Sequence, residues 1–192
     1  MDKKLQAALE RIAEETINGG HIFELVDTYY QCVIMKIDEH DNEDEPDDQP
    51  FPDELYQPLE QRDSGIFEAL SILLKQGHDV NDEADGINSL MLSVANADVH
   101  MTKYLIEHGA NPNNCPDMDN ESLYPKSENY YLEDIDLKYT DACFGNDERY
   151  KESLLQTAQV LVEGGGLKSF GGLCLLVDSS GNVSLELPKK KY

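Results

Sequence analysis

Two stretches of the chain follow one pattern: Leu73-Leu74-Lys75-Gln76-Gly77-His78-Asp79-Val80-Asn81 and Leu105-Ile106-Glu107-His108-Gly109-Ala110-Asn111-Pro112-Asn113. In each stretch an apolar helical pattern ends at a glycine and an asparagine follows. The glycines are 109 − 77 = 32 residues apart, and the asparagines are 113 − 81 = 32 residues apart. A helical unit that recurs at this period is typical of stacked repeats, which bury their apolar faces against one another. The sequence therefore predicts a helical repeat protein.

The residues around the first stretch predict a helix, a reversal and a second helix. Ser64 is expected to cap a helix over 65–76, and Gly77 stands where a helix needs a left-handed C-terminal residue. Asp85-Gly86 is the strongest reversal pattern in the chain. The first helix is expected to face inward through Phe67, Leu70, Leu73 and Leu74.

The segment from Asp85 to Asn113 resembles an ankyrin repeat. Asn88-Ser89 stands where the family has Thr-Pro and still offers a capping side chain, whereas Met91 replaces the family's histidine. The resemblance implies a mainly α, ankyrin-like helical solenoid of three to four units. The residues that match or nearly match the family pattern are Gly86, Leu90, Ser93, Leu105, Gly109, Ala110 and Asn113.

The rest of the chain is read as one domain, 1–192, built around this repeat. An amphipathic helix over 3–17 and a broadly apolar helix over 21–37 precede it, and two short strands, 173–177 and 183–187, form a β-hairpin after it. The expected parts are a helical pair at 1–37, an acidic insertion at 38–63, core repeats at 64–114, an expanded repeat at 115–166 and a hairpin cap with a tail at 167–192.

The expanded repeat carries about 24 extra residues, because its glycine spacing is 165 − 109 = 56 rather than 32. Most of the excess is placed in a tyrosine-rich stretch around 124–133. Helices are expected over 132–144 and 151–162, and the second is expected to end at Glu163-Gly164-Gly165-Gly166.

The net charge of the chain limits the classes of molecule that it is expected to bind. With 39 Asp+Glu against 15 Lys+Arg, the formal net charge is −24. Such a chain repels nucleic-acid phosphates and anionic membrane surfaces and attracts basic proteins. We expect a basic protein partner, no nucleic acid and no membrane, and a monomeric chain. Scattered cysteines and the absence of a signal-peptide or membrane-spanning pattern predict a cytoplasmic location.

The sequence predicts no catalytic residue, no metal ligand and no cofactor. The histidines do not pair at metal-ligand spacing and are interpreted as surface residues near helix C-termini. Of these, His78 and His108 lie beside glycines that are expected to end helices. The glycine run at 164–166 lacks the lysine of a phosphate-binding loop. A non-enzymatic protein is expected. Two alternatives stay open: an enzyme that uses a carboxylate or a cysteine such as Cys115 or Cys143, and a purely structural scaffold.

Three groups of residues are candidates for partner binding. The acidic run over 38–48 is either a docking surface or a solvated loop. Tyrosines of the expanded repeat bring a large contact area with a polar tip, although half of them are expected in the core. The ankyrin resemblance implies that fingers and inner helices line a concave binding face. The candidates are Asp41, Glu43, Asp44 and Glu45 in the acidic run, Glu83, Asp85, Met91, Asn96 and Asp98 by position in the repeat, and Tyr130 and Tyr131.

Small acidic ankyrin-like chains with irregular repeats also resemble bacterial immunity or antitoxin proteins, which cover a toxic enzyme. This resemblance implies a more specific form of the same hypothesis, in which the acidic surface counters a basic substrate-binding surface.

Overall fold

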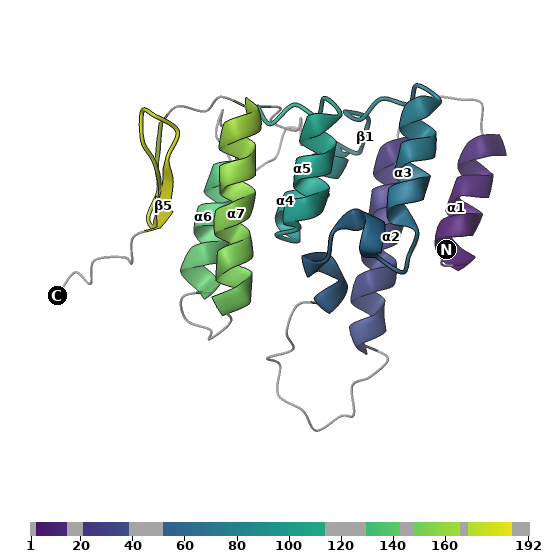
Figure 1. The fold of residues 1–192 in the computed structure, drawn as a ribbon, viewed down its shortest axis with the longest axis horizontal. Coiled ribbons are helices and arrows are strands. Elements are labelled where there is room, and N and C mark those ends of the chain that lie inside the picture. The colour runs from purple at the N-terminus through teal and green to yellow at the C-terminus, as the bar shows by residue number, and fades with distance from the viewer. Residues whose placement is uncertain are drawn as a thin grey trace. The chain divides into compact units, whose positions relative to one another are not determined.

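A computed structural model describes residues 3–14, 21–38, 52–113, 130–142, 148–165 and 169–185. The fold is mainly α with a small C-terminal sheet, which confirms the predicted fold class (Figure 1). The chain divides into two compact units, Met1–Leu92 and Ser93–Tyr192, here called the N-terminal and C-terminal units. The prediction that the whole chain is one domain stays a prediction.

The N-terminal unit contains the helical pair and the first repeat. Its helices are α1 (Lys3–Glu14), α2 (His21–Asp38), the 3-10 helices η1 (Asp53–Tyr56) and η2 (Leu59–Gln61), and α3 (Ile66–Lys75). A two-stranded finger of β1 (Glu83–Ala84) and β2 (Ile87–Asn88) follows, and α4 (Ser89–Ala95) crosses into the next unit.

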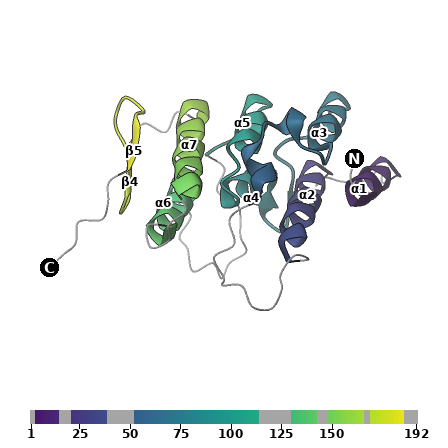
Figure 2. The same cartoon turned by 60° about the horizontal axis from the view of Figure 1, so that its bottom comes forward.

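The C-terminal unit contains three further helices and a sheet. The helices are α5 (Val99–Glu107), α6 (Tyr130–Ala142) and α7 (Glu148–Gly165), and the strands are β3 (Phe170–Gly171), β4 (Leu175–Val177) and β5 (Val183–Leu185). Helices α6 and α7 lie side by side in both views (Figures 1 and 2). Part of the stretch predicted as an insertion is therefore helical, since Tyr130 and Tyr131 begin α6.

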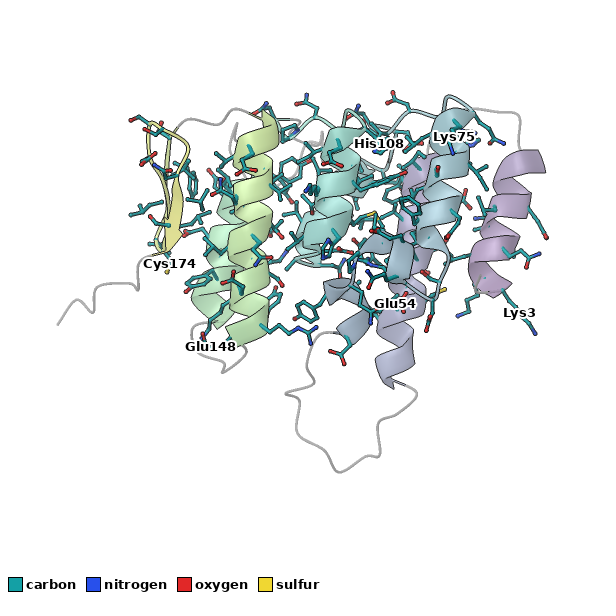
Figure 3. All side chains as sticks on the ribbon, viewed as in Figure 1. Lys3, Glu54, Lys75, His108, Glu148 and Cys174 are labelled. Carbon is teal, nitrogen blue, oxygen red and sulfur yellow. The ribbon has the colours of Figure 1, made fainter. Side chains whose placement is uncertain are left out.

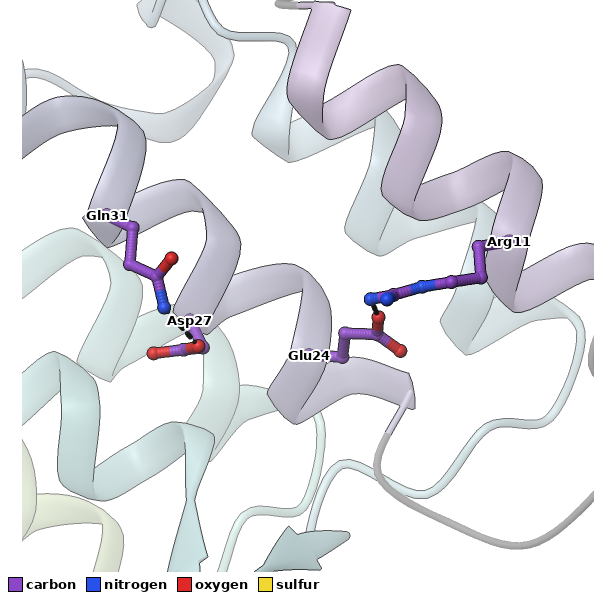
Figure 4. Close-up of polar contacts among 4 residues, drawn as sticks. All are labelled: Arg11, Glu24, Asp27 and Gln31. Carbon is purple, nitrogen blue, oxygen red and sulfur yellow. Dashed lines mark hydrogen bonds and ion pairs between the residues drawn. The ribbon is translucent and has the colours of Figure 1, made fainter.

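Helix α2 forms the centre of the N-terminal unit, as its broad apolar pattern predicts. Helices α1 and α3 both contact it. An ion pair between Arg11 of α1 and Glu24 of α2 spans one of these contacts (Figure 4). The buried side chains of this unit include Leu5, Ile22, Leu25, Val26, Tyr29, Val33, Ile66 and Leu70.

The second half of the acidic insertion predicted over 38–63 contains short helices. From Pro52 the chain forms two short 3-10 helices, which bury Leu55 and Leu59. Arg62 is buried behind them because its guanidinium donates to the Tyr29 hydroxyl at 2.8 Å and to the Leu55 carbonyl at 3.1 Å. These bonds satisfy a buried charge, a requirement that a count of acids and prolines does not reveal.

Helix α3 starts one residue later than predicted. Gly65, with a φ of 72°, occupies the N-cap position, and the Ser64 hydroxyl accepts from the Ile66 amide at 3.4 Å instead. The inward face therefore differs from the predicted one. Ile66, Ala69, Leu70 and Leu73 are buried, whereas Phe67 and Leu74 are half-buried.

Glycines hold α5 and α7 close together in the C-terminal unit. Helix α7 ends at Gly165, within the glycine run at which the sequence predicts its end. A Cβ at Gly164 would lie 2.3 Å from Ile106 Cγ2, and one at Gly165 would lie 2.3 Å from Pro112 Cγ. The side chain of Asn113 also donates to the Gly165 carbonyl at 3.3 Å. These glycines therefore serve close packing as well as the end of a helix.

The C-terminal sheet confirms the predicted hairpin and adds a third strand. The strand order is β3-β4-β5, all antiparallel, with Leu176 opposite Gly171 on one side and Ser184 on the other. The sequence did not predict strand β3, because this strand is short and begins next to a glycine-rich segment. Side chains fill the space between the sheet and the neighbouring helices, and Cys174, labelled at the lower end of the sheet, is fully buried (Figure 3).

One buried carboxylate joins this sheet to α6. Asp136 accepts from the backbone amides of Leu173, Cys174 and Leu175 at 2.7, 2.8 and 2.6 Å. A Cβ at Gly172 would lie 2.4 Å from the Asp136 carboxyl carbon, so the loop before β4 wraps closely around the carboxylate. Three consecutive amides thus obtain a charged acceptor, the stronger kind of hydrogen bond.

We predict that Gly165→Ala lowers the free energy of unfolding by about 1–3 kcal/mol, because the new methyl group overlaps the stiff Pro112 ring. Urea denaturation followed by circular dichroism measures the change. Gly171→Ala is the control, since a Cβ there meets nothing within 4 Å. Equal stability of the two variants would refute the close approach of α5 and α7.

We also predict that Asp136→Ala lowers the free energy of unfolding by about 3 kcal/mol, since it leaves three backbone amides without their acceptor. Asp134→Ala on the same helix removes a partly exposed pair with Lys138 and is expected to change it by less than about 1 kcal/mol. Thermal and urea unfolding of both variants make the comparison. A loss at Asp134 as large as that at Asp136 would contradict the prediction.

Candidate protein-binding finger

The two-stranded finger is the best-defined candidate site. Glu83 pairs with Asn88 and Ala84 with Ile87 in antiparallel register. Asp85 and Gly86 connect the strands with φ values of 53° and 76°, so both turn residues are left-handed, as in the tight turns that favour Asp-Gly. The predicted reversal is confirmed. This turn presents the side chains of Glu83 and Asp85 to solvent.

A side-chain cap joins the finger to α4. The Asn88 side-chain oxygen accepts from the Met91 amide at 2.9 Å, the bond expected of an N-cap residue. The prediction that Asn88 replaces the family's capping threonine is confirmed. Ser89, at the family's proline position, is fully buried, and its hydroxyl has no hydrogen-bond partner among the described residues. Met91 is half-buried on the first turn of α4.

The base of the finger is anchored to α2. Asp82, which directly precedes β1, accepts from the amides of Ile22 and Phe23 at 2.9 and 3.0 Å. These amides belong to the first turn of α2 and have no acceptor within the helix. The Asp82 carboxylate therefore caps a helix that lies about 60 residues earlier in the chain.

Two histidines lie beside this anchor. The rings of His21 and His78 stack with centroids 4.6 Å apart and an interplanar angle of 31°. The sequence places the histidines at the surface near helix C-termini, and this is wrong for His21, which is buried at the N-terminus of α2. Its burial follows from the packing of α2 against the loop after α3. No pattern within either segment indicates this contact.

Burial shifts the pKa values of two of these groups. The pKa of His78 is lowered, first by burial and then by the charge of His21, against the opposing charge of Asp82. Burial raises the pKa of Asp82, and its bonds to the Ile22 and Phe23 amides act in the opposite direction. In both cases burial disfavours the charged form.

The remaining candidates in the repeat fall into two groups. Asn96 is half-buried after α4. Asp98 is fully buried and caps α5, because its carboxylate accepts from the Met101 amide at 3.0 Å. Its side chain therefore has a structural role, and we remove it from the candidate contacts. Nearby, the Thr102 hydroxyl donates to the buried Ser93 hydroxyl at 3.0 Å.

The structure describes the two candidate tyrosines but not the candidate residues of the acidic run. Tyr131 is 2 % exposed, so it belongs to the core, whereas Tyr130 is half-buried and meets the Tyr131 ring edge-on at 5.6 Å between centroids. We retain Tyr130 alone as a candidate contact. Asp41, Glu43, Asp44 and Glu45 lie outside the described residues.

The described residues offer little that bears on catalysis. Among them, His, Cys, Asp and Glu do not gather in a group of three or more that could hold a metal ion. Cys32 and Cys174 are buried, the environment of an inert thiol, and Cys115 and Cys143 lie outside the described residues. Within the same part of the chain, no helix has the length and apolar character needed to cross a bilayer.

Comparison with known proteins identifies one family. Residues 85–117 match the family model described as ankyrin repeat. The match begins at the finger turn and continues through α4 and α5 to the stretch after Asn113. No curated protein and no solved structure matches the chain.

Proposed function

We propose that the chain binds a basic protein partner through its acidic finger, because residues 85–117 match the ankyrin repeat and ankyrin repeats are protein-interaction modules. The observation that carries the proposal is the finger itself. Its strands are paired, its turn is left-handed at both residues, and its two carboxylates are exposed.

Rigidity favours the finger as a contact surface. The Asn88 cap fixes its outgoing strand to α4, and the Asp82 anchor fixes its incoming strand to α2. A preorganised loop loses less conformational entropy when it binds than a flexible loop does. Glu83 and Asp85 can therefore serve as binding contacts with little further ordering, with Met91 beside them as an apolar contact. Asn96 and Tyr130 are the proposed contacts of the C-terminal unit.

Net charge supports the choice of a basic partner. At −24, the chain attracts cations at long range and repels other anions. Such steering raises association rates, and added salt weakens it because the Debye length shortens to about 8 Å at physiological ionic strength. The acidic run with Asp41, Glu43, Asp44 and Glu45 would add to this field.

A toxic enzyme with a basic substrate-binding surface is the partner that we propose more specifically. An acidic immunity or antitoxin protein would cover that surface and exclude the substrate. Electrostatic complementarity is the main support for this choice of partner. It favours partners of opposite charge more than it increases the affinity of binding.

Capture from a lysate of the source organism at low salt, followed by measurement of association rates with the captured protein, tests the proposal. We predict that Glu83→Gln with Asp85→Asn weakens binding about five- to tenfold, through lost charge contacts. Asparagine tolerates the left-handed conformation of Asp85, so the turn should survive. The association rate of the unaltered chain should fall at least about tenfold between 50 and 500 mM salt.

The matched control is Glu60→Gln with Glu68→Gln. Both residues are exposed in the same unit, on η2 and α3, and the pair changes the net charge by the same amount. It should keep the affinity within about twofold of the original value. Equal losses in the two variants, or association that ignores salt, would refute the finger as the contact. A separate variant with serine at Asp41, Glu43, Asp44 and Glu45 measures the share of the acidic run.

A further inference from the structure

The cluster of His21, His78 and Asp82 couples the first turn of α2 to the finger. Asp82 accepts from two amides of α2 and directly precedes Glu83, the first residue of β1. His21 is 9 % exposed, and its Nδ1 has no hydrogen-bond partner among the described residues. His78, from the loop after α3, stacks on it with ring centroids 4.6 Å apart.

A proton on His78 has an unfavourable position. The N-terminus of a helix carries a partial positive charge, and His21 is the first residue of α2. A charged His78 would therefore stack against a buried ring at the cationic end of the helix. The acidic groups that face the cluster are Asp82 and, behind it, Asp79, both in the loop after α3. Glu24, in the first turn of α2, is already paired with Arg11.

The Asp82 carboxylate cannot bind the α2 amides and a protonated His78 equally well. Its two oxygens accept from Ile22 and Phe23, and these bonds require the carboxylate to face the helix amides. An imidazolium at His78 is a competing cation for the same oxygens. Protonation therefore favours an arrangement in which the carboxylate turns toward His78, or in which His78 moves into water.

We propose that His21, His78 and Asp82 form a pH-sensitive latch, which holds the base of the finger against α2 at neutral pH and releases it when His78 takes a proton. Release would loosen the first turn of α2 and the strand that carries Glu83. The latch would thereby link the pH of the surroundings to the order of the finger.

The direction of the pH effect follows from the lowered pKa of His78. The unfolded histidine takes a proton near its ordinary pKa of 6.5, before the folded one does. Acidification through this window therefore favours the open state, and the closed state is fully favoured above about pH 6.5. The raised pKa of Asp82 acts in the opposite direction, because uptake of a proton by this carboxyl at lower pH favours the closed state.

Amide hydrogen exchange of the full chain, resolved by NMR at pH 7.5 and 5.5 and corrected for intrinsic exchange rates, tests the latch. We predict that protection of the Ile22 and Phe23 amides falls about threefold or more at the lower pH, because the open state takes up protons at His78 more readily than the closed state does. The Cys174 amide is the internal control. Asp136 holds it in the C-terminal unit, and its protection should stay constant.

Variants identify the group that takes the proton. In His78→Gln, protection of Ile22 and Phe23 should change less than about twofold between the two pH values, since the titrating ring is gone. His100→Gln, on α5, should retain the full response of the unaltered chain. A pH-independent protection of Ile22 and Phe23 in the unaltered chain would overturn the latch. So would an unchanged response in His78→Gln.

Discussion

The bond from the Asp82 carboxylate to the first turn of α2 is the constraint on which the N-terminal unit depends. The start of a helix has amides without acceptors inside the helix, and burial leaves them unsatisfied unless another group reaches them. Asp82 reaches Ile22 and Phe23 from a loop about 60 residues later. This contact fixes α2, the loop after α3 and the base of the finger together.

The C-terminal unit uses the same chemistry. Asp136 of α6 accepts from three consecutive amides before and at the start of β4, and Gly172 lets the chain pass close to the carboxylate. A carboxylate that holds backbone amides from a distant segment thus appears in both units. In a chain with 39 Asp and Glu residues, these two carboxylates join elements that local helix formation alone would leave unconnected.

The sequence predicted what local patterns determine. Apolar periodicity located the helices, Asp85-Gly86 located the finger turn, and alternation located the hairpin of β4 and β5. Contacts between distant segments were not predicted. The glycines of α7 end the helix as predicted, but their close packing was not predicted, because it depends on Ile106 and Pro112 in a distant segment. The places of Asp82 and Asp136 depend on partners that no spacing in the sequence indicates.

The exposure of the candidate contact residues was predictable only where a local turn determines it. Exposure at Glu83 and Asp85 follows from their positions at a local turn, which the sequence determines. Asp98 and Tyr131 looked equally available, but tertiary packing buries both, one as a helix cap and the other in the core. Tertiary packing therefore leaves only some of the candidate side chains exposed to a partner. Among them, the exposed carboxylates of the finger best fit the proposed binding role.

Removing the carboxylate of Asp82 tests most directly whether it anchors the N-terminal unit. Asp82→Ala is expected to lower the free energy of unfolding by about 2–4 kcal/mol, because two amides lose a charged acceptor. Exchange at Ile22 and Phe23 should accelerate, while exchange at Leu173, Cys174 and Leu175 stays slow under their own carboxylate. Unchanged stability together with unchanged exchange at Ile22 and Phe23 would contradict the anchoring role of Asp82.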